Sequence, residues 1–580
     1  MSEKVAEMSL FCYPSRGKMS SLQVYVSRGN EYARIVESYR DPVTKKPKTK
    51  ILKNLGRVDL LEKNEPGIIE RLKKECVESK ELNKQLKEEA IRKEVEKLLK
   101  GKEGTEEATG FPVQNYGVRI YQKIWDEMRL DRFFANRQKK DSKIRYDLGS
   151  VVKMLVLSRL MAPASKKRSY ERKDQFIGQG EMEIEQVYRC LPFLAKEKEN
   201  LEAYMNQQLS RKMDRSLSVA FYDVTTYYFE SVAADDLAKF GYSKDNKVNQ
   251  VQVVMGLLID QAGIPISYSL FPGNTSDFKT LIPVMKDLKK RYGITKMILT
   301  ADRGLNSGEN LAFLKAEGFD YVVGFKVRSA SQSIRQQILD EKGYVPVGDD
   351  FRWKFLAYTK NDPGSRFDDR ICVTWSAKRA AKDRADRERL IKKSLRLVES
   401  KSRLEAEMKK GGKKYVQLSL LADQVPVFDQ KKVEADELFD GYYGIQTSDH
   451  SLTYEQVLDI YSGLWKIEES FRVLKTDLEA RPIFVKKPTS VQGHFVICYL
   501  ALVIQRYLEY LLSERGLSVS TEKIQDALRS ANVTTLPDLG KNRKAIYIKN
   551  QSNEDFSTIL KALSIPEIPT FGTIGDIMRW

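Results

Sequence analysis

The sequence predicts an α/β fold built on a mixed β-sheet, and three observations support this prediction. Strand and helix patterns alternate between residues 216 and 330, in the order of three strands, a helix, a strand, a helix and a strand. Two of the strands end in an aspartate, Asp223 and Asp302. A later amphipathic helix carries Glu468 at the edge of its apolar stripe. With 580 residues, 41% of them apolar, the chain is long enough for several hydrophobic cores.

The predicted sheet consists of short apolar runs that are typical of strands. The five runs are residues 218–224, 250–260, 264–271, 296–302 and 320–327. A tight turn from Gln261 to Gly263 joins the second run to the third. One helix begins near Asp277, a good N-cap residue, and another spans residues 307–318. This order is that of an RNase H-like domain, in which a mixed sheet gathers strand-end carboxylates at one edge.

Composition and turn signals divide the rest of the chain around this core. We expect an N-terminal β-rich basic domain, a charged helical linker, a helical DNA-binding domain and the first part of the core. A β-rich insertion with a long charged helix, the second part of the core with Glu468, and a C-terminal region follow. The boundaries of these seven parts are 1–64, 65–110, 111–215, 216–330, 331–445, 446–515 and 516–580.

The chain is strongly basic, with 99 Lys and Arg against 80 Asp and Glu, a net charge of +19 and a pI near 9.3. This excess favours a polyanionic partner, because cations that neutralise phosphates release counterions. Basic residues concentrate in three places. They are the turn with Lys45, Lys46, Lys48 and Lys50, the cluster from Arg159 to Lys173, and the arm from Lys378 to Lys414. The turn and the arm are each either a contact with DNA or a partner, or an ordinary solvated surface. The cluster belongs to helices that either read DNA or form a scaffold.

Composition disfavours several other classes of protein. The five cysteines are scattered without a CxxC pair and the only histidines are His450 and His494, so we expect neither a zinc site nor a disulfide framework. No apolar run reaches the ~18 residues of a membrane span, and the first residues lack the pattern of a secretory signal. We therefore expect a cytoplasmic protein of bacterial type without a membrane partner, associated with the nucleoid when bound to DNA.

Residues 451–478 predict one amphipathic helix. Its apolar stripe consists of Val457, Ile460, Leu464, Ile467, Phe471, Leu474 and Leu478. At about 100° per residue, Glu468 lies roughly 70° from the centre of the stripe and Glu469 nearly opposite the centre. Glu468 is therefore expected at the border between the core and a site, whereas Glu469 should point to water.

The face of this helix that carries Glu468 also carries other groups suited to nucleic acid. Tyr461 and Lys475 lie two turns on either side of Glu468, with Trp465 and Arg472 slightly further round. A carboxylate beside an apolar core is costly to place, so three of them require a shared partner, most simply a divalent cation.

The chain resembles the DDE transposases of bacterial insertion sequences, in the group with a strand-rich insertion before the final Glu. The motifs that carry the resemblance are YDVTTYYFE, PGNTSD, LTADRG and YSGLWKIEESFRVLKTDL, within residues 215–515. The N-terminal ESYRD and LKNLG segments are also similar to one branch of that group. The resemblance implies that Asp223, Asp302 and Glu468 are the catalytic residues and hold two Mg²⁺ (or Mn²⁺) ions.

The family's helix signature is Tyr-x2-Arg-x3-Glu-x6-Lys, whose Tyr and Lys contact phosphates of the transposon end. This chain has the matching residues at Tyr461 and Lys475, but the Arg position is Leu464. Either Arg472 or Lys466 supplies the missing cation, or that contact is absent.

The resemblance implies a transposase that acts on double-stranded DNA, both transposon ends and target. Water first cuts a strand at the element's end, and the freed 3′-OH then attacks either the opposite strand or target DNA. Trp465, Tyr227 or Tyr228 is a candidate to stack on a displaced base, with packing as the alternative role. A homodimer on DNA is expected from the resemblance. Two alternatives remain, an RNase H-like nuclease without strand transfer and a non-catalytic DNA-binding relative.

Overall fold

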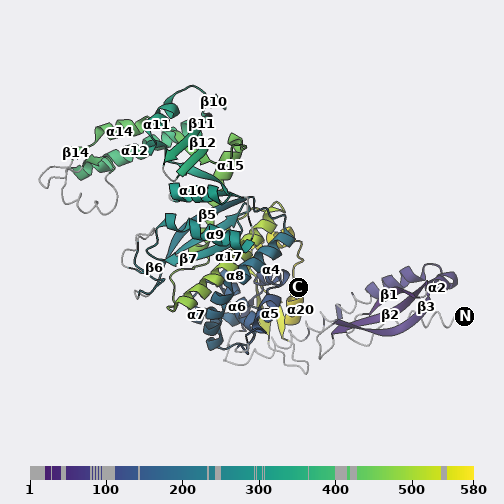
Figure 1. Ribbon diagram of the computed structural model, residues 1–580. Coiled ribbons are helices and arrows are strands. Elements are labelled where there is room, and N and C mark those ends of the chain that lie inside the picture. The colour runs from purple at the N-terminus through teal and green to yellow at the C-terminus, as the bar shows by residue number, and fades with distance from the viewer. Residues whose placement is uncertain are drawn as a thin grey trace. The chain divides into compact units, whose positions relative to one another are not determined.

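The computed structural model describes most of the chain after residue 19 (Figure 1). The described residues are 20–27, 29–40, 47–78, 81, 85–86, 89, 93, 111–141, 144–230, 234–241, 250–292, 294, 297–302, 305, 307–362, 365–398, 414–417, 427–536 and 545–580. Lys45 and Lys46 of the predicted basic turn lie outside them, as do residues 94–110 of the linker and 399–413 of the charged arm. Two compact units are present, one within residues 1–116, 530–553 and 566–580, the other within residues 117–529 and 554–565.

The first unit contains two antiparallel sheets. One coincides with the N-terminal strand patterns and consists of β1 (Ser20–Ser27), β2 (Asn30–Arg40) and β3 (Pro47–Arg57), followed by α2 (Val58–Asn64). Its apolar face, with Ala33 and Ile35, packs on Ile68 and Leu72. The other sheet joins both ends of the unit and consists of β4 (Val113–Asn115), β16 (Asn532–Leu536), β17 (Ile546–Lys549) and β18 (Phe571–Thr573), followed by α20 (Ile574–Arg579).

The second unit has a helical part that contains one long apolar helix, α17 (Pro488–Ser513) (Figure 1). The other helices of this part are α4 (Arg119–Glu127), α5 (Leu130–Gln138), α6 (Leu148–Met161), α7 (Lys166–Glu171), η2 (Lys173–Gln175), α8 (Ile184–Lys212), α18 (Thr521–Ser530) and α19 (Glu554–Ala562). α17 packs directly on α4, α6 and α8.

The length of α17 corrects the expectation that no apolar run could span a membrane. By length and composition this helix of 26 residues qualifies, since its Lys, Arg, Asp and Glu residues are few. However, 78% of its apolar window is buried against the rest of the unit. A helix that is hydrophobic all round is expected in such a position, at the centre of a large core.

The central sheet has the predicted order of strands and helices. It contains β5 (Val219–Tyr228), β6 (Gln252–Asp260), β7 (Pro265–Pro272), β8 (Ile298–Ala301) and β9 (Asp320–Phe325), with η3 (Asp277–Lys279), α9 (Leu281–Tyr292) and α10 (Gly308–Ala316) between strands. Their order across the sheet is β7-β6-β5-β8-β9. β5, β6 and β7 pair antiparallel, whereas β5, β8 and β9 pair parallel. The RNase H-like mixed sheet is thereby confirmed.

Most of the strand-rich insertion extends this same sheet, and one pair of its strands forms a separate two-stranded sheet. It contains η4 (Val327–Ser329), α11 (Gln332–Leu339), β10 (Val345–Pro346), β11 (Phe351–Asp362), β12 (Ser365–Ser376), α12 (Ala377–Val398), β13 (Val416–Gln417), β14 (Val427–Phe428), α14 (Gln430–Glu437) and β15 (Tyr442–Thr447). β15 pairs antiparallel with β9, and β12, β11 and β10 follow outward, which gives nine strands. The insertion is therefore hydrogen-bonded to the core through β15 and β9, over four residues of each strand.

A buried carboxylate joins the insertion to the core. Asp369 of β12 accepts hydrogen bonds from Tyr321 Oη of β9 (2.5 Å) and Gln446 Nε2 of β15 (2.6 Å). Its other oxygen pairs with Lys315 Nζ of α10 at 2.8 Å. The Asp369 side chain is fully buried, so these partners replace the water that its charge would otherwise require.

Candidate active site

Asp223 and Asp302 belong to neighbouring parallel strands. The pairing of β5 with β8 ends at Tyr222 opposite Ala301. Asp223 follows Tyr222 in β5, and Asp302 follows Ala301 directly. Adjacent strands are about 4.8 Å apart. The backbone register therefore brings the two aspartates to the same level of the sheet, where Asp223 is half-buried and Asp302 is exposed.

Alternation along β5 places Asp223 on the sheet face opposite to α9 and α10. Its neighbours Tyr222 and Val224 belong to the core that these two helices form with the sheet. Tyr227 shares the face of Asp223 and packs edge-on against Phe495 of α17, with 5.2 Å between ring centroids. Asp223 thus faces the side of the sheet that α17 covers.

The segment that carries Glu468 is not the single helix that its apolar stripe predicted. The structure has α15 (Tyr454–Ser462), α16 (Trp465–Arg472) and a π-helix, η5 (Val473–Asp477), with a turn at Gly463 and Leu464 between the first two. Leu464 is consequently only half-buried. The three signature positions Tyr461, Glu468 and Lys475 therefore belong to three different segments.

Two contacts fix this segment along the Asp223 face of β5. At one end Gly463 lies so close to Phe221 that an added Cβ would be 2.4 Å from the ring's Cζ. At the other end Lys475 Nζ lies 5.8 Å from the centroid of the Tyr227 ring. Because Phe221 and Tyr227 share one face of the strand, the segment runs alongside β5 in the same direction.

The position of Glu468 follows from these two anchors. It is five residues beyond Gly463, or about 7.5 Å at 1.5 Å per helical residue. A strand rises about 3.3 Å per residue, so the same advance from Phe221 along β5 ends close to residue 223. α16 also contacts both β5 and β6. Glu468 is therefore on a helix over the Asp223 face, level with Asp223.

The three carboxylates do not form a closed metal site. Glu468 is exposed, as is Asp302. Among the residues that the structure describes, no three His, Cys, Asp or Glu side chains come close enough together to hold a metal ion. The donor types fit Mg²⁺, which prefers carboxylate oxygens. Asp223 and Asp302 meet at one level of the sheet through the register of β5 and β8, and α16, which carries Glu468, contacts β5.

The predicted DNA contacts on α15 and α16 have different surroundings. Tyr461 Oη accepts a hydrogen bond from Tyr443 Oη of β15 at 2.8 Å. Lys466 Nζ donates to the carbonyl of Gln261 at 2.6 Å, in the turn between β6 and β7. Trp465 is 60% exposed, which is unusual for an indole. Of these three, Trp465 presents the most accessible surface.

Arg472 is engaged by carboxylates of its own segment. Its guanidinium pairs with Glu469 at 2.8 Å and with Asp477 at 3.3 Å. The hydrogen bond from Arg472 lowers the pKa of Glu469, whereas burial raises the pKa of Asp477. Glu469 has a side chain that is only 28% exposed. The expectation that Glu469 points freely to water is therefore wrong.

Part of the basic cluster predicted between Arg159 and Lys173 is buried. Arg159 donates to the carbonyls of Leu478 (3.1 Å) and Glu479 (2.9 Å), at the end of η5. Lys166 Nζ hydrogen-bonds His494 Nδ1 of α17 at 2.8 Å. Burial lowers the pKa of Lys166 to about 7. Arg159 therefore stabilises the segment that follows η5. Because Arg159 and Lys166 are both buried, neither is accessible to DNA.

The structure contains another basic surface, which was not predicted from the sequence. Six cations line one cavity between α5 and α8: Arg129, Arg132, Arg137, Lys139, Lys140 and Arg211. Five of them recur within a single stretch around α5, and that density is the one signal in the sequence that could have indicated the surface.

Comparison with known protein families shows the family to which the chain belongs. Residues 214–504, half of the chain, match the model of the transposase DDE domain. Residues 24–106 match the N-terminal domain of IS1634 family transposases. The chain therefore belongs to the DDE transposases of insertion sequences, and it is a DNA transposase.

Solved transposase structures show weaker similarity. The piggyBac transposase synaptic complex with hairpin DNA has 10% sequence identity and a TM-score of 0.32, over 73% of this chain and 82% of that one. The Mos1 transposase paired-end complex with left transposon end has 13% identity and a TM-score of 0.14, over 30% and 57%. A pre-cleavage Mos1 transpososome has 12% identity and a TM-score of 0.14, over 30% and 58%. No curated protein matches the chain.

Proposed function

We propose that this transposase cleaves DNA strands at the ends of its insertion sequence and joins the freed 3′-OH to target DNA, with Asp223, Asp302 and Glu468 as the catalytic residues. The observation that carries the proposal is the placement of the three carboxylates. Asp223 lies within β5, Asp302 directly follows β8, the parallel neighbour of β5, and α16, which carries Glu468, contacts β5.

The three carboxylates would hold two divalent cations, Mg²⁺ or Mn²⁺. When bound, such ions polarise the attacking oxygen and stabilise the leaving oxygen of an in-line displacement at phosphorus. Asp223 and Asp302 are fixed by the sheet, so they set the positions of the ligands. Glu468 is on a separate element, so its distance from them depends on how α16 packs on β5.

Residues flanking Glu468 would position the DNA. The Lys475 ammonium lies over the Tyr227 ring, near the C-terminal end of β5. A phosphate of the transposon end is proposed to bind there. The exposed indole of Trp465 is available to stack on a displaced base. Further DNA contacts are proposed for Tyr461, Lys466 and Arg472. In these contacts DNA replaces the protein groups with which the three side chains now interact.

A strand-cleavage assay with one isosteric substitution tests the proposal. The substrate is a duplex carrying the terminal repeat that flanks the gene, with supercoiled plasmid as target. Glu468→Gln is expected to lower cleavage by at least about a thousandfold while binding of the duplex is unchanged. The substitution removes a carboxylate ligand of the metal ions but leaves the volume of the side chain nearly the same. Glu469→Gln is the matched control and is expected to retain most cleavage. Equal cleavage by Glu468→Gln and the wild type would refute the assignment.

The products of the same assay separate transposase from nuclease chemistry. A transposase yields target DNA covalently joined to the 3′ end of the duplex, and chelation of the metal by EDTA abolishes both cleavage and joining. Cleavage that never gives joined product would instead support an RNase H-like nuclease. Metal-independent binding without cleavage would support a non-catalytic relative.

We also propose that double-stranded DNA is bound by a homodimer that pairs two ends, in the bacterial cytoplasm and at the nucleoid. The N-terminal β-rich domain (1–64) and the helical domain (111–215) are the proposed DNA-binding parts. Light scattering of the full chain with and without end duplex tests the stoichiometry. A complex with the mass of two chains and two duplexes is expected, and a complex with the mass of one chain and one duplex at saturation would contradict the proposal.

A further inference from the structure

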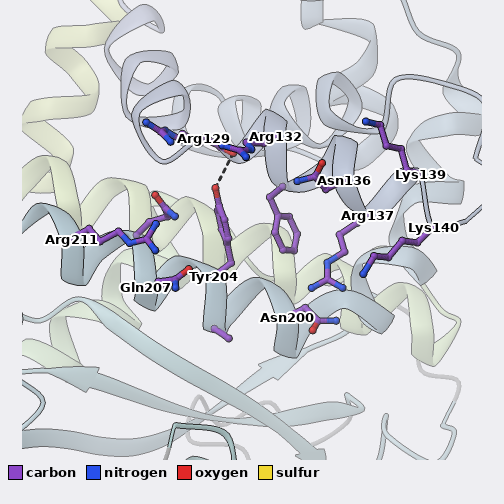
Figure 2. Close-up of a pocket in the computed structure, with 13 residues that line it drawn as sticks. Arg129, Arg132, Asn136, Arg137, Lys139, Lys140, Asn200, Tyr204, Gln207 and Arg211 are labelled. Carbon is purple, nitrogen blue, oxygen red and sulfur yellow. Dashed lines mark hydrogen bonds between the residues drawn. The ribbon is translucent and has the colours of Figure 1, made fainter.

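The cavity between α5 and α8 in the second unit is a strongly positive concave surface. It has a volume of about 960 Å³, and Figure 2 shows cationic and amide side chains around it. The six cations named above line it, and no Asp or Glu does. Cations concentrated in one concave surface repel one another and raise the local concentration of anions.

Five of the six cations have no acidic partner among the described residues. Arg137 alone is paired, with Glu197 at 3.4 Å. Arg129, Arg132, Lys139, Lys140 and Arg211 are all exposed. Elsewhere in the unit exposed cations commonly have a partner, such as Lys523 with Asp555 at 3.0 Å. The positive charge of the cavity is therefore uncompensated within this part of the chain.

The wall of the cavity is a built structure. Tyr204 of α8 donates from its hydroxyl to the carbonyls of Met128 and Arg129, both at 3.1 Å, which ties α8 to the junction of α4 and α5. The Phe133 ring packs on Tyr204 with 4.9 Å between centroids. Arg129 itself has a left-handed backbone (φ 54°), a strained conformation for a non-glycine residue. These contacts hold the rim of the cavity in place.

A buried polar group opens into the cavity without a protein partner. Gln208 of α8 is only 6% exposed and lines the cavity. Its carboxamide makes no hydrogen bond with any residue that the structure describes. The carboxamide of Gln208 keeps contact with solvent although most of the residue is buried. It is therefore available to hydrogen-bond a phosphate that enters the cavity.

We propose that this cavity binds the sugar-phosphate backbone of duplex DNA independently of base sequence. Guanidinium, ammonium and amide groups are the donors that phosphates accept. The α8 side of the cavity extends from Asn200 to Arg211, about 16 Å at 1.5 Å per residue. That length corresponds to about five base pairs along the duplex axis. The surface is concave, so it cannot enter a groove to reach base edges. The inference deepens the proposed function by naming a DNA-backbone site for it.

Binding of the full chain to two DNA probes tests the inference. One probe is a random-sequence 40-bp duplex and the other is a 40-bp duplex with the terminal repeat, both in EDTA so that no cleavage occurs. The variant combines Arg129→Gln, Arg132→Gln and Arg211→Gln. The control removes the same charge at exposed positions of the same unit, with Arg515→Gln, Lys523→Gln and Lys561→Gln.

The expected result is a loss on both probes and a flatter salt dependence. Three lost phosphate contacts reduce the slope of log K against log salt by about 2.7, and weaken binding by roughly two orders of magnitude at about 0.1 M salt. The control is expected to bind within about twofold of the wild type. Gln208→Glu, which puts a carboxylate in the cavity, should weaken both probes as well, whereas Gln175→Glu at an exposed position should not.

Three results would overturn the inference. The first is that the cavity variant binds both probes as tightly as the control. The second is that it loses affinity only for the terminal-repeat duplex, which would mean that the cavity recognises bases. The third is that Gln208→Glu binds both probes as tightly as the wild type. The proposed chemistry is tested separately, because Glu468→Gln should bind both probes normally. A failure of either idea is therefore recognisable without the other.

Discussion

Gly463 is the residue that sets the position of Glu468. Its backbone contacts the Phe221 ring so closely that no Cβ fits, and it breaks the predicted helix into α15 and α16. The helix turns at a glycine because the ring of a core strand occupies the space of a side chain. The sequence pattern alone continued through this residue, since apolar positions on both sides kept a helical period.

Gly463→Ala is therefore expected to shift α16 away from β5 and lower strand cleavage by one to two orders of magnitude, because a displacement of about 1 Å suffices for that effect. DNA binding should change by less than about threefold. Gly308→Ala is the control, since a Cβ there meets nothing within 4 Å. A second-site change, Phe221→Leu, should restore part of the activity of Gly463→Ala. Full activity of Gly463→Ala would contradict the anchoring role.

Lys166 and His494 form a buried pair whose titration is expected to affect stability. Burial lowers the pKa of Lys166 to about 7, and burial together with Lys166 lowers the pKa of His494 below its usual value. His494 Nε2 lies 3.0 Å from the carbonyl of Ala480, so the pair holds the chain that follows η5. Neutral forms of both residues are favoured in the folded protein.

Stability should consequently rise with pH between about 7 and 10. In that interval Lys166 is protonated in the unfolded chain and neutral in the folded chain, so unfolding takes up one proton. The free energy of unfolding therefore rises by about 1.4 kcal/mol per pH unit. The folded protein should also lose stability as pH falls below about 6.5, where His494 gains a proton on unfolding. Urea unfolding of Lys166→Met is expected to lack the alkaline rise. An unchanged pH profile in that variant would show that Lys166 is charged when folded.

At the scale of elements, the insertion depends on Asp369 for its connection to the core. This carboxylate bridges β12, β9, β15 and α10 through Tyr321, Gln446 and Lys315. The order of strands in the core could be predicted because each strand is a short apolar run. The pairing of β15 with β9 could not, since it joins segments over a hundred residues apart and hydrophobic patterns do not encode partners.

Asp369→Ala is expected to reduce the free energy of unfolding by about 3–5 kcal/mol, because it leaves Lys315 and two buried donors without their acceptor. Asp368→Ala, at the exposed neighbouring position, is expected to change it by less than about 0.5 kcal/mol. Chemical denaturation of both variants provides the measurement. Equal stability of the two variants would mean that strand pairing alone holds the insertion.

At the scale of the whole molecule, the sequence indicated candidate catalytic residues but not the basic cavity. Asp302 directly follows β8 as predicted, whereas β5 continues to Tyr228, so Asp223 lies within its strand and not at its end. The cations concentrated around α5 are visible in the sequence, but the cavity is not, since its other wall comes from α8, some seventy residues away. For Arg159 and Lys166 the sequence left open whether they read DNA or belong to a scaffold, because charges that are close in sequence reveal nothing of their burial.

The distribution of cations therefore gives the transposase two kinds of positive site. Buried cations such as Arg159 support the segment that carries Glu468, and exposed cations around α5 and α8 are proposed to hold DNA. This division is consistent with phosphate contacts that position a duplex while a separate carboxylate site acts on it.

The central claim is that the three carboxylates meet at common metal ions when DNA is bound. Fe²⁺ in place of Mg²⁺, with peroxide, generates hydroxyl radicals at the bound metal that cut the nearby protein backbone. In the complex with end duplex, we expect cuts at residues 222–224, 301–303 and 467–469, all suppressed by excess Mg²⁺. Cuts near only one or two of these segments, or cuts that Mg²⁺ does not suppress, would contradict the claim.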